Sequence, residues 1–180
     1  MENLSKYKIS FTGLSIGEHR YNFELDDAFF EFFDKSEITH ARINLDLVME
    51  KSNSMMVLDF NLSGKVELIC DRCSEMYWQI IETSNRLFIK FGNAYYEQSD
   101  DIIVIPDNET HFDIAQYIYE FIHLNLPIRR LHRGGKEKSD NCDPDILKKI
   151  EKLNVKTDDQ GIPKTGRTDQ WEVLKKLKNN

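Results

Sequence analysis

Two of the three cysteines of this 180-residue chain, Cys70 and Cys73, form a C-x-x-C pair in the stretch VELICDRCSEMYW at residues 66–78. Such a pair can ligate a metal, cycle as a redox dithiol or occupy a turn without further chemistry. A thioredoxin-type redox pair opens a helix, whose N-terminus lowers the pKa of the first thiol. The residues after Cys73, SEMYWQII, have the composition of a strand instead. The sequence therefore favours a metal ligand pair or plain thiols over redox chemistry.

A structural zinc site needs four ligands in a closed tetrahedron. The third cysteine, Cys142, shares a polar stretch with His132, so the predicted ligand set is Cys70, Cys73, His132 and Cys142. One structural zinc ion on these four residues would tie the stretch after His132 to the sheet. Because H-x9-C is a looser spacing than C-x-x-C, reduced thiols at a strand turn beside an unrelated Cys142 remain the alternative.

Motifs of common enzyme classes are absent from the sequence. It contains no P-loop, no Gly-rich dinucleotide turn, no H-E-x-x-H and no G-x-S-x-G. Glu120 and His123 are three residues apart and can share a helix face, which permits an acid–base role but more often marks an ordinary surface pair. We therefore expect a protein without catalytic residues.

Basic residues gather in the last third of the chain. Residues 129–180 carry 14 Lys and Arg against 9 Asp and Glu, whereas residues 1–128 carry 10 against 22. The stretch IRRLHRGGK offers a phosphate-binding loop, with candidate RNA contacts at Arg129, Arg130, Arg133 and Lys136. The acidic body would repel phosphate but can hold a basic protein. A solvated charged surface without a specific partner is the simpler reading of the same pattern.

The composition is that of a globular, cytoplasmic protein. Hydrophobic residues make up 40 % of the chain and aromatic residues 11 %. No apolar run reaches the roughly 20 residues that span a bilayer, and MENLSKYKIS lacks the apolar core of a secretory signal. Three cysteines do not make a disulfide framework. We expect no membrane contact.

Residues 7–107 predict a run of antiparallel strands. The segments 7–14 and 19–25 alternate polar and apolar residues around a Gly-containing turn and predict a hairpin. In the segment 38–52, Ala41, Ile43, Leu45 and Leu47 repeat with period two, which places them on one sheet face. Further strands are predicted over 54–70, over 76–92 and at the IIVI of 102–105.

Helices are predicted mainly after residue 107. Apolar residues recur at helical spacing over 110–126, and Pro127 ends this helix. A short aromatic helix at 26–33, a helix over 144–154 and a C-terminal helix over 168–180 complete the prediction. Three apolar residues on the last helix form a candidate partner-docking face: Trp171, Leu174 and Leu177.

These elements predict one α+β domain over residues 1–153. Its curved antiparallel sheet or partial barrel is covered by the amphipathic helix at 110–126. A mobile linker over 154–167 and the C-terminal helical tail over 168–180 follow.

The order of these features resembles the YceD family, the large ribosomal RNA subunit accumulation proteins. The resemblance runs from about residue 40 to the end of the chain. It rests on CDRC between strands, on YEFIHLNLP, and on TDQWEVLKKL, which stands where the family commonly has a D-P-R-W-x-x-L-like ending. Family members often carry several cysteines where this chain has Cys142.

The resemblance implies a non-enzymatic, cytoplasmic factor of large ribosomal subunit biogenesis. Such a factor supports accumulation of large-subunit ribosomal RNA, and its expected partners are that RNA or the pre-ribosomal large subunit. Members often lie beside a gene for a large-subunit ribosomal protein, which makes a basic ribosomal protein a further candidate partner. A small thiol-redox protein built on Cys70 and Cys73, or an adaptor that contacts only proteins, remains the alternative.

Overall fold

A computed structural model describes residues 4–34, 36–132 and 142–153 of the chain. The chain divides into two compact units, Met1–His132 and Arg133–Asn180. All strands of the described residues belong to the first unit. The described part of the second unit contains helix α3 (Pro144–Leu153), where the predicted helix lies, and the Asp143 carboxylate accepts a hydrogen bond from the Asp145 N–H at 2.8 Å. The predicted linker and C-terminal helix lie outside the described residues.

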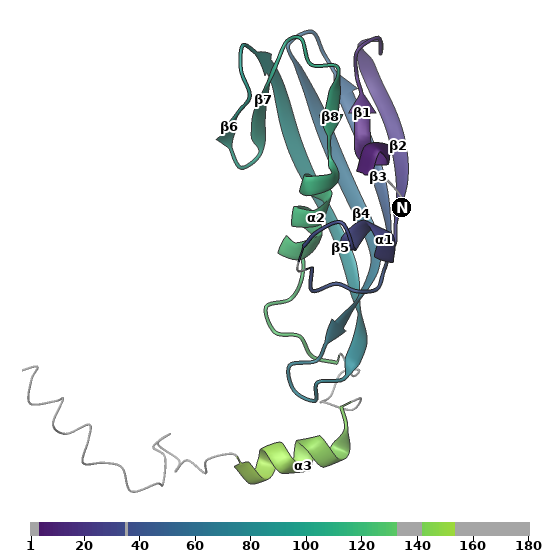
Figure 1. The fold of residues 1–180 in the computed structure, drawn as a ribbon, viewed down its shortest axis with the longest axis vertical. Coiled ribbons are helices and arrows are strands. Elements are labelled where there is room, and N and C mark those ends of the chain that lie inside the picture. The colour runs from purple at the N-terminus through teal and green to yellow at the C-terminus, as the bar shows by residue number, and fades with distance from the viewer. Residues whose placement is uncertain (1–3, 35, 133–141, 154–180) are drawn as a thin grey trace, which may run out of the picture. The chain divides into compact units, whose positions relative to one another are not determined.

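The first unit is built on one six-stranded sheet with the strand order β2-β3-β4-β5-β7-β6 (Figure 1). Neighbours pair antiparallel except β5 and β7, which are parallel. The strands are β2 (Gly17–Leu25), β3 (Ala41–Lys51), β4 (Met55–Ile69), β5 (Met76–Gly92), β6 (Tyr96–Ser99) and β7 (Ile102–Pro106). The α+β class and the mostly antiparallel sheet are as predicted, and the sheet is not closed into a barrel.

One face of the sheet carries the core. Ala41, Ile43, Leu45 and Leu47 on β3 are each at most 2 % exposed, so the period-two prediction is confirmed. Their neighbours on β4, such as Phe60 and Leu62, are buried in register with them. Burying each of the Ile, Leu and Phe side chains contributes about 2 kcal/mol. This register is therefore strongly favoured, because a one-residue slip would expose the whole set.

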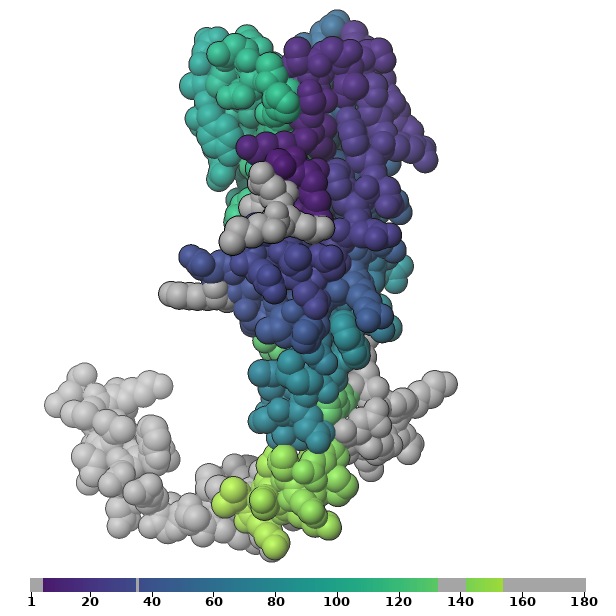
Figure 2. Space-filling view, turned by 45° about the vertical axis from the view of Figure 1, so that its right-hand side comes forward, coloured from purple at the N-terminus to yellow at the C-terminus, as the bar shows by residue number. Residues whose placement is uncertain are grey.

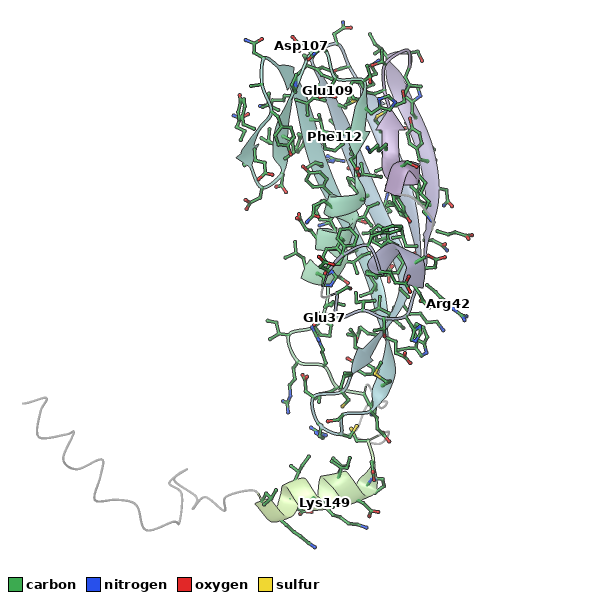
Figure 3. The ribbon with its side chains drawn as sticks, viewed as in Figure 1. Glu37, Arg42, Asp107, Glu109, Phe112 and Lys149 are labelled. Carbon is green, nitrogen blue, oxygen red and sulfur yellow. The ribbon has the colours of Figure 1, made fainter. Side chains whose placement is uncertain are left out.

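The predicted hairpin between residues 7–14 and 19–25 is wrong. Strand β1 (Lys8–Ser10) pairs with β8 (His111–Asp113) instead, and β2 pairs with β3. Figure 2 shows the dark-purple N-terminal segment beside the green segment that contains β8. Ile9 and Phe112 face each other in this two-stranded ladder and both are buried (Phe112 is labelled in Figure 3). Pairing with β8 lets the ladder bury both side chains against the sheet, which a local hairpin would not do.

Helix α2 (Ala115–Leu124) is shorter than predicted because residues 111–113 form β8. The Asp113 carboxylate accepts a hydrogen bond from the Ala115 N–H at 2.9 Å, which satisfies one of the free backbone donors at the start of the helix. The buried side of the helix packs into the core, where the Phe121 ring meets the Phe60 ring edge-on at 5.1 Å. Helix α1 (Asp27–Phe30) buries Phe29 and Phe30. Among the described residues, no helix combines the length and apolar character that crossing a membrane requires.

An exposed His–Asp pair joins α1 to the start of β3. The His40 ring Nδ1 lies 2.8 Å from one Asp27 oxygen, and the other oxygen accepts a hydrogen bond from the Ala41 N–H at 2.8 Å. The hydrogen bond and the charge of Asp27, with a smaller contribution from Glu67, raise the pKa of His40 above 6.5. The hydrogen bond from His40 lowers the pKa of Asp27 below 3.8.

We expect this pair to stabilise the fold most between about pH 4 and pH 6.5. The His40 contribution is complete below about pH 6.5 and is lost as the pH rises through its raised pKa, because the charged ring is the paired form. The Asp27 contribution is lost as the pH falls through its lowered pKa. The difference in melting temperature between the wild type and His40→Ala should therefore shrink above pH 7. A pH-independent difference, or an equal effect of His19→Ala, would contradict this.

Candidate metal centre

The two thiols of the C-x-x-C pair sit on the tight turn between β4 and β5. The Ser74 N–H donates to the Cys70 carbonyl and the Cys70 N–H to the Glu75 carbonyl, each at 2.9 Å. Ser74 has a φ of 61°, the left-handed conformation that closes the turn. Strand β5 begins at Met76, so the predicted strand–turn–strand setting is confirmed and no helix follows Cys73.

The segment after α2 is attached to this turn by Asp71 and Arg130. The Asp71 N–H donates to the Arg130 carbonyl at 2.8 Å, and the Arg130 N–H donates to the Asp71 carboxylate at 2.7 Å. The Arg130 guanidinium binds Glu37 at 2.5 Å (Glu37 is labelled in Figure 3). These bonds hold the backbone two residues before His132 in a set position.

His132 lies at the turn as a result. Its Nδ1 is 3.7 Å from the Cys73 sulfur, and its ring stands edge-on to Tyr77 with the centroids 5.3 Å apart. Packing against Tyr77 restricts the rotation of the imidazole, and a ligand that is held in place loses less entropy when a metal binds.

The structure brings together all four predicted ligands, Cys70, Cys73, His132 and Cys142. Their ligand atoms lie within 4.8 Å of one another, and this is the one such cluster found in the described residues. A tetrahedral zinc ion with bonds of about 2.0 to 2.3 Å holds its ligands about 3.3 to 3.8 Å apart, so a small contraction would complete the coordination. The three cysteines are at most 5 % exposed. The cluster can therefore bind a zinc ion.

Hydrogen bonds at Cys70 prepare its sulfur for a metal. Burial alone would raise the pKa of this thiol, but hydrogen bonds from the backbone of Cys73, Arg72 and His132, and from the Cys73 side chain, lower the pKa to about 6. Cys70 is therefore largely a thiolate at neutral pH, which is the form that ligates metals. A redox thiol would also have a low pKa, yet reactive thiols are partly exposed and Cys70 is fully buried.

The candidate RNA contacts differ in exposure and in whether the structure describes them. Arg129 is exposed, whereas the Arg130 side chain is only 27 % exposed and already binds Glu37. Arg133, Lys136 and the three candidate docking residues Trp171, Leu174 and Leu177 lie outside the described residues. Glu120 and His123 form other contacts: Glu120 accepts from Gln116 at 2.7 Å, and His123 Nδ1 lies 2.8 Å from the Tyr119 carbonyl.

Sequence patterns did not reveal an exposed apolar surface beside the turn. On β4 and β5, Ile69 pairs with Met76, and Trp78 and Ile80 follow on the same outward face, with exposures of 41 % to 71 %. The Lys65 ammonium lies over the Trp78 ring at 4.7 Å. One feature of the sequence indicates this surface: Ile80 and Ile81 are adjacent. In a strand with one solvated face, apolar and polar residues alternate, so two apolar residues in a row place one of them on the outward face.

Comparison with known proteins gives one match. The family described as large ribosomal RNA subunit accumulation protein YceD matches residues 58–178. No curated protein and no solved structure matches the chain significantly. The matched segment begins within β4, later than the resemblance from about residue 40 predicts, and it contains the complete candidate metal centre. Because this match covers more than half of the chain, the protein belongs to the YceD family, the large ribosomal RNA subunit accumulation proteins.

Proposed function

We propose that this protein acts by binding, without catalysis, in the biogenesis of the large ribosomal subunit. The observation that carries the proposal is the family match over residues 58–178. The candidate centre supports it, because four protein ligands would fill a zinc tetrahedron and leave no position for a substrate. Zinc on this centre would be structural. The proposed location is the cytoplasm, where bacterial subunits are assembled.

Within this proposal, the zinc site organises a contact surface. Zinc would hold the turn between β4 and β5 against His132, and Arg129 is exposed only three residues earlier. Arg129, Arg133 and Lys136 are the proposed phosphate contacts, and the KKLK sequence at 175–178 adds basic charge. Arg130 differs, since its bond to Glu37 supports a structural role in the turn. Trp171, Leu174 and Leu177 remain the proposed docking face for a protein of the particle.

A triple Ala substitution at Arg129, Arg133 and Lys136 should weaken association with large-subunit particles. Each lost phosphate contact should lower the slope of the salt dependence by about 0.7 to 1 in log–log units, because fewer counterions are released. Co-sedimentation across a salt series measures both effects. The matched control is Arg20→Ala combined with Lys65→Ala and Lys90→Ala, which removes the same charge from the sheet. Unchanged co-sedimentation of the first variant would exclude these RNA contacts and favour a protein-only adaptor.

The second candidate function, thiol redox chemistry, rests on the lowered pKa of Cys70. It requires a disulfide between Cys70 and Cys73 that forms and breaks reversibly. Titration of thiols under a glutathione redox series, together with metal analysis of the purified protein, separates the two functions. Reversible formation of this disulfide at cytosolic potentials would favour the redox function, whereas inert thiols with one bound zinc would favour the structural site.

A further inference from the structure

An open groove lies on the first unit, away from the metal ligands. It has a volume of about 690 Å³ and is lined by Asn85 of β5 and by residues from β6, β7, β8, α2 and the connections next to them. The elements that form it can be followed in Figure 1. Ile103, Ile105, Phe112 and Phe121 supply buried apolar surface at its base. A concave site with an apolar base is the usual form of a binding site rather than of a solvated face.

Two tyrosines supply an aromatic wall. The Tyr117 ring stacks on Phe112 at 5.5 Å, and its hydroxyl lies 3.3 Å from the hydroxyl of Tyr95. Tyr95 is 59 % exposed although it is a large aromatic residue. Exposed aromatic faces beside negative charge attract cations, and arginine most of all.

Carboxylates surround this wall. Among the described residues, the lining of the groove contains no lysine or arginine, whereas six acidic side chains line it: Glu97, Asp100, Asp101, Glu109, Asp113 and Glu120. Lys8 is a nearby cation, and it borders Glu109 in the adjoining hollow (Glu109 is labelled in Figure 3). Burial and the hydrogen bond with Tyr95 raise the pKa of Tyr117, and Glu97 and Glu120 raise it further. The groove is therefore a region of negative potential.

The carboxylates do not converge on a point. In the described residues, the cysteine–histidine cluster is the one group whose ligand atoms lie close enough together for a metal ion. The groove thus suits several positive charges distributed along a chain. The carboxylates would repel the phosphates of a nucleic acid, so a nucleic acid is excluded as the ligand. A second copy of residues 1–128 is excluded for the same reason, because it would bring the same acidic excess.

We propose that this groove binds an extended lysine- and arginine-rich segment of another protein. Basic side chains would lie against the aromatic wall of Tyr95 and Tyr117 and pair with the surrounding carboxylates, while apolar side chains of the segment would cover the base. The choice of partner rests on the proposed function, because RNA-binding ribosomal proteins carry such basic segments. Occupying them before they meet RNA would protect them from unspecific association.

The test measures binding of a fluorescein-labelled peptide of repeated Lys-Leu-Arg-Gly units to the full chain by fluorescence anisotropy. The groove variant carries Gln at Glu97, Glu109 and Glu120. The matched control carries Gln at Glu24, Glu50 and Glu82, three exposed glutamates on the strands of the sheet. We expect the groove variant to bind at least about 10-fold more weakly and the control to change less than about 3-fold.

Equal losses in the two variants would overturn the inference, because the attraction would then follow net charge alone. A wild type that does not bind the peptide would overturn it too. Gln at Lys175, Lys176 and Lys178 tests whether the chain's own basic end occupies the groove, and tighter peptide binding by that variant would overturn the choice of another protein. Co-sedimentation of the wild type with large-subunit particles is measured separately, so failure of the groove is distinguishable from failure of the proposed function.

Discussion

Replacing Cys73 by Ser should abolish stoichiometric zinc in the purified protein. Changes beside a metal ligand typically lower affinity about 10- to 100-fold, and removing the ligand itself should cost more than about 100-fold. His132→Gln should have the same result, because its Nδ1 lies 3.7 Å from the Cys73 sulfur and belongs to the same cluster. Metal analysis of the protein purified under reducing conditions measures the zinc content per chain.

The zinc prediction extends to stability. Free zinc at about 1,000 times the dissociation constant stabilises a folded protein by about 4 kcal/mol, so a chelator should lower the melting temperature of the wild type. It should leave Cys73→Ser unchanged. The matched control is His111→Gln, which removes an exposed histidine outside the cluster and should keep both the zinc and the response to the chelator. Wild-type protein without metal, or variants with full zinc content, would exclude the site.

Gly64→Ala should strongly destabilise the sheet. Gly64 lies in β4 between Ile43 of β3 and Ile81 of β5, with a φ of +156°. A Cβ at this position would be 2.2 Å from the Arg42 carbonyl oxygen and 2.6 Å from the Ile43 Cα. Both are backbone atoms of a central strand, so neither can rotate away, and β3 would have to separate from β4.

We expect Gly64→Ala to lower the free energy of unfolding by about 3 kcal/mol, near the upper end for overpacked sites. For a chain of this size, that loss lowers the melting temperature by about 6 to 12 °C. The control is Ser63→Ala at the exposed neighbouring position, which should change stability by less than about 0.5 kcal/mol. A Gly64→Ala melting temperature within about 2 °C of the wild type would show that the strands accommodate the methyl group.

Much of the metal centre could be predicted from the sequence because its first half is local. The C-x-x-C spacing lies between two strand patterns, and a tight turn brings such thiols together whatever the rest of the fold does. The second half of the set is less local: Cys142 is the one further cysteine of the chain, and His132 lies in the same polar stretch. The bonds that hold His132 were not predictable, because Arg130 binds Glu37 across 93 residues.

The acidic groove could not be predicted for a related reason. Its carboxylates come from β6 and the loop after it, from the connection before β8, from the end of β8 and from the exposed side of α2. Each is an ordinary polar residue in its own segment. Only the parallel placement of β7 beside β5, together with β8 and α2, collects them around one hollow.

The sequence by itself determined the local elements of this protein: the alternating strands, the amphipathic α2 and the strand turn that carries Cys70 and Cys73. Side-chain periodicity and turn residues act within a few positions, so the patterns that favour these elements can be identified without the rest of the fold. Only the tertiary structure decided that β1 joins β8, because both hairpin and ladder satisfy the backbone of β1. The choice depends on which pairing buries Ile9 and Phe112, and that surface exists only after the six-stranded sheet has formed.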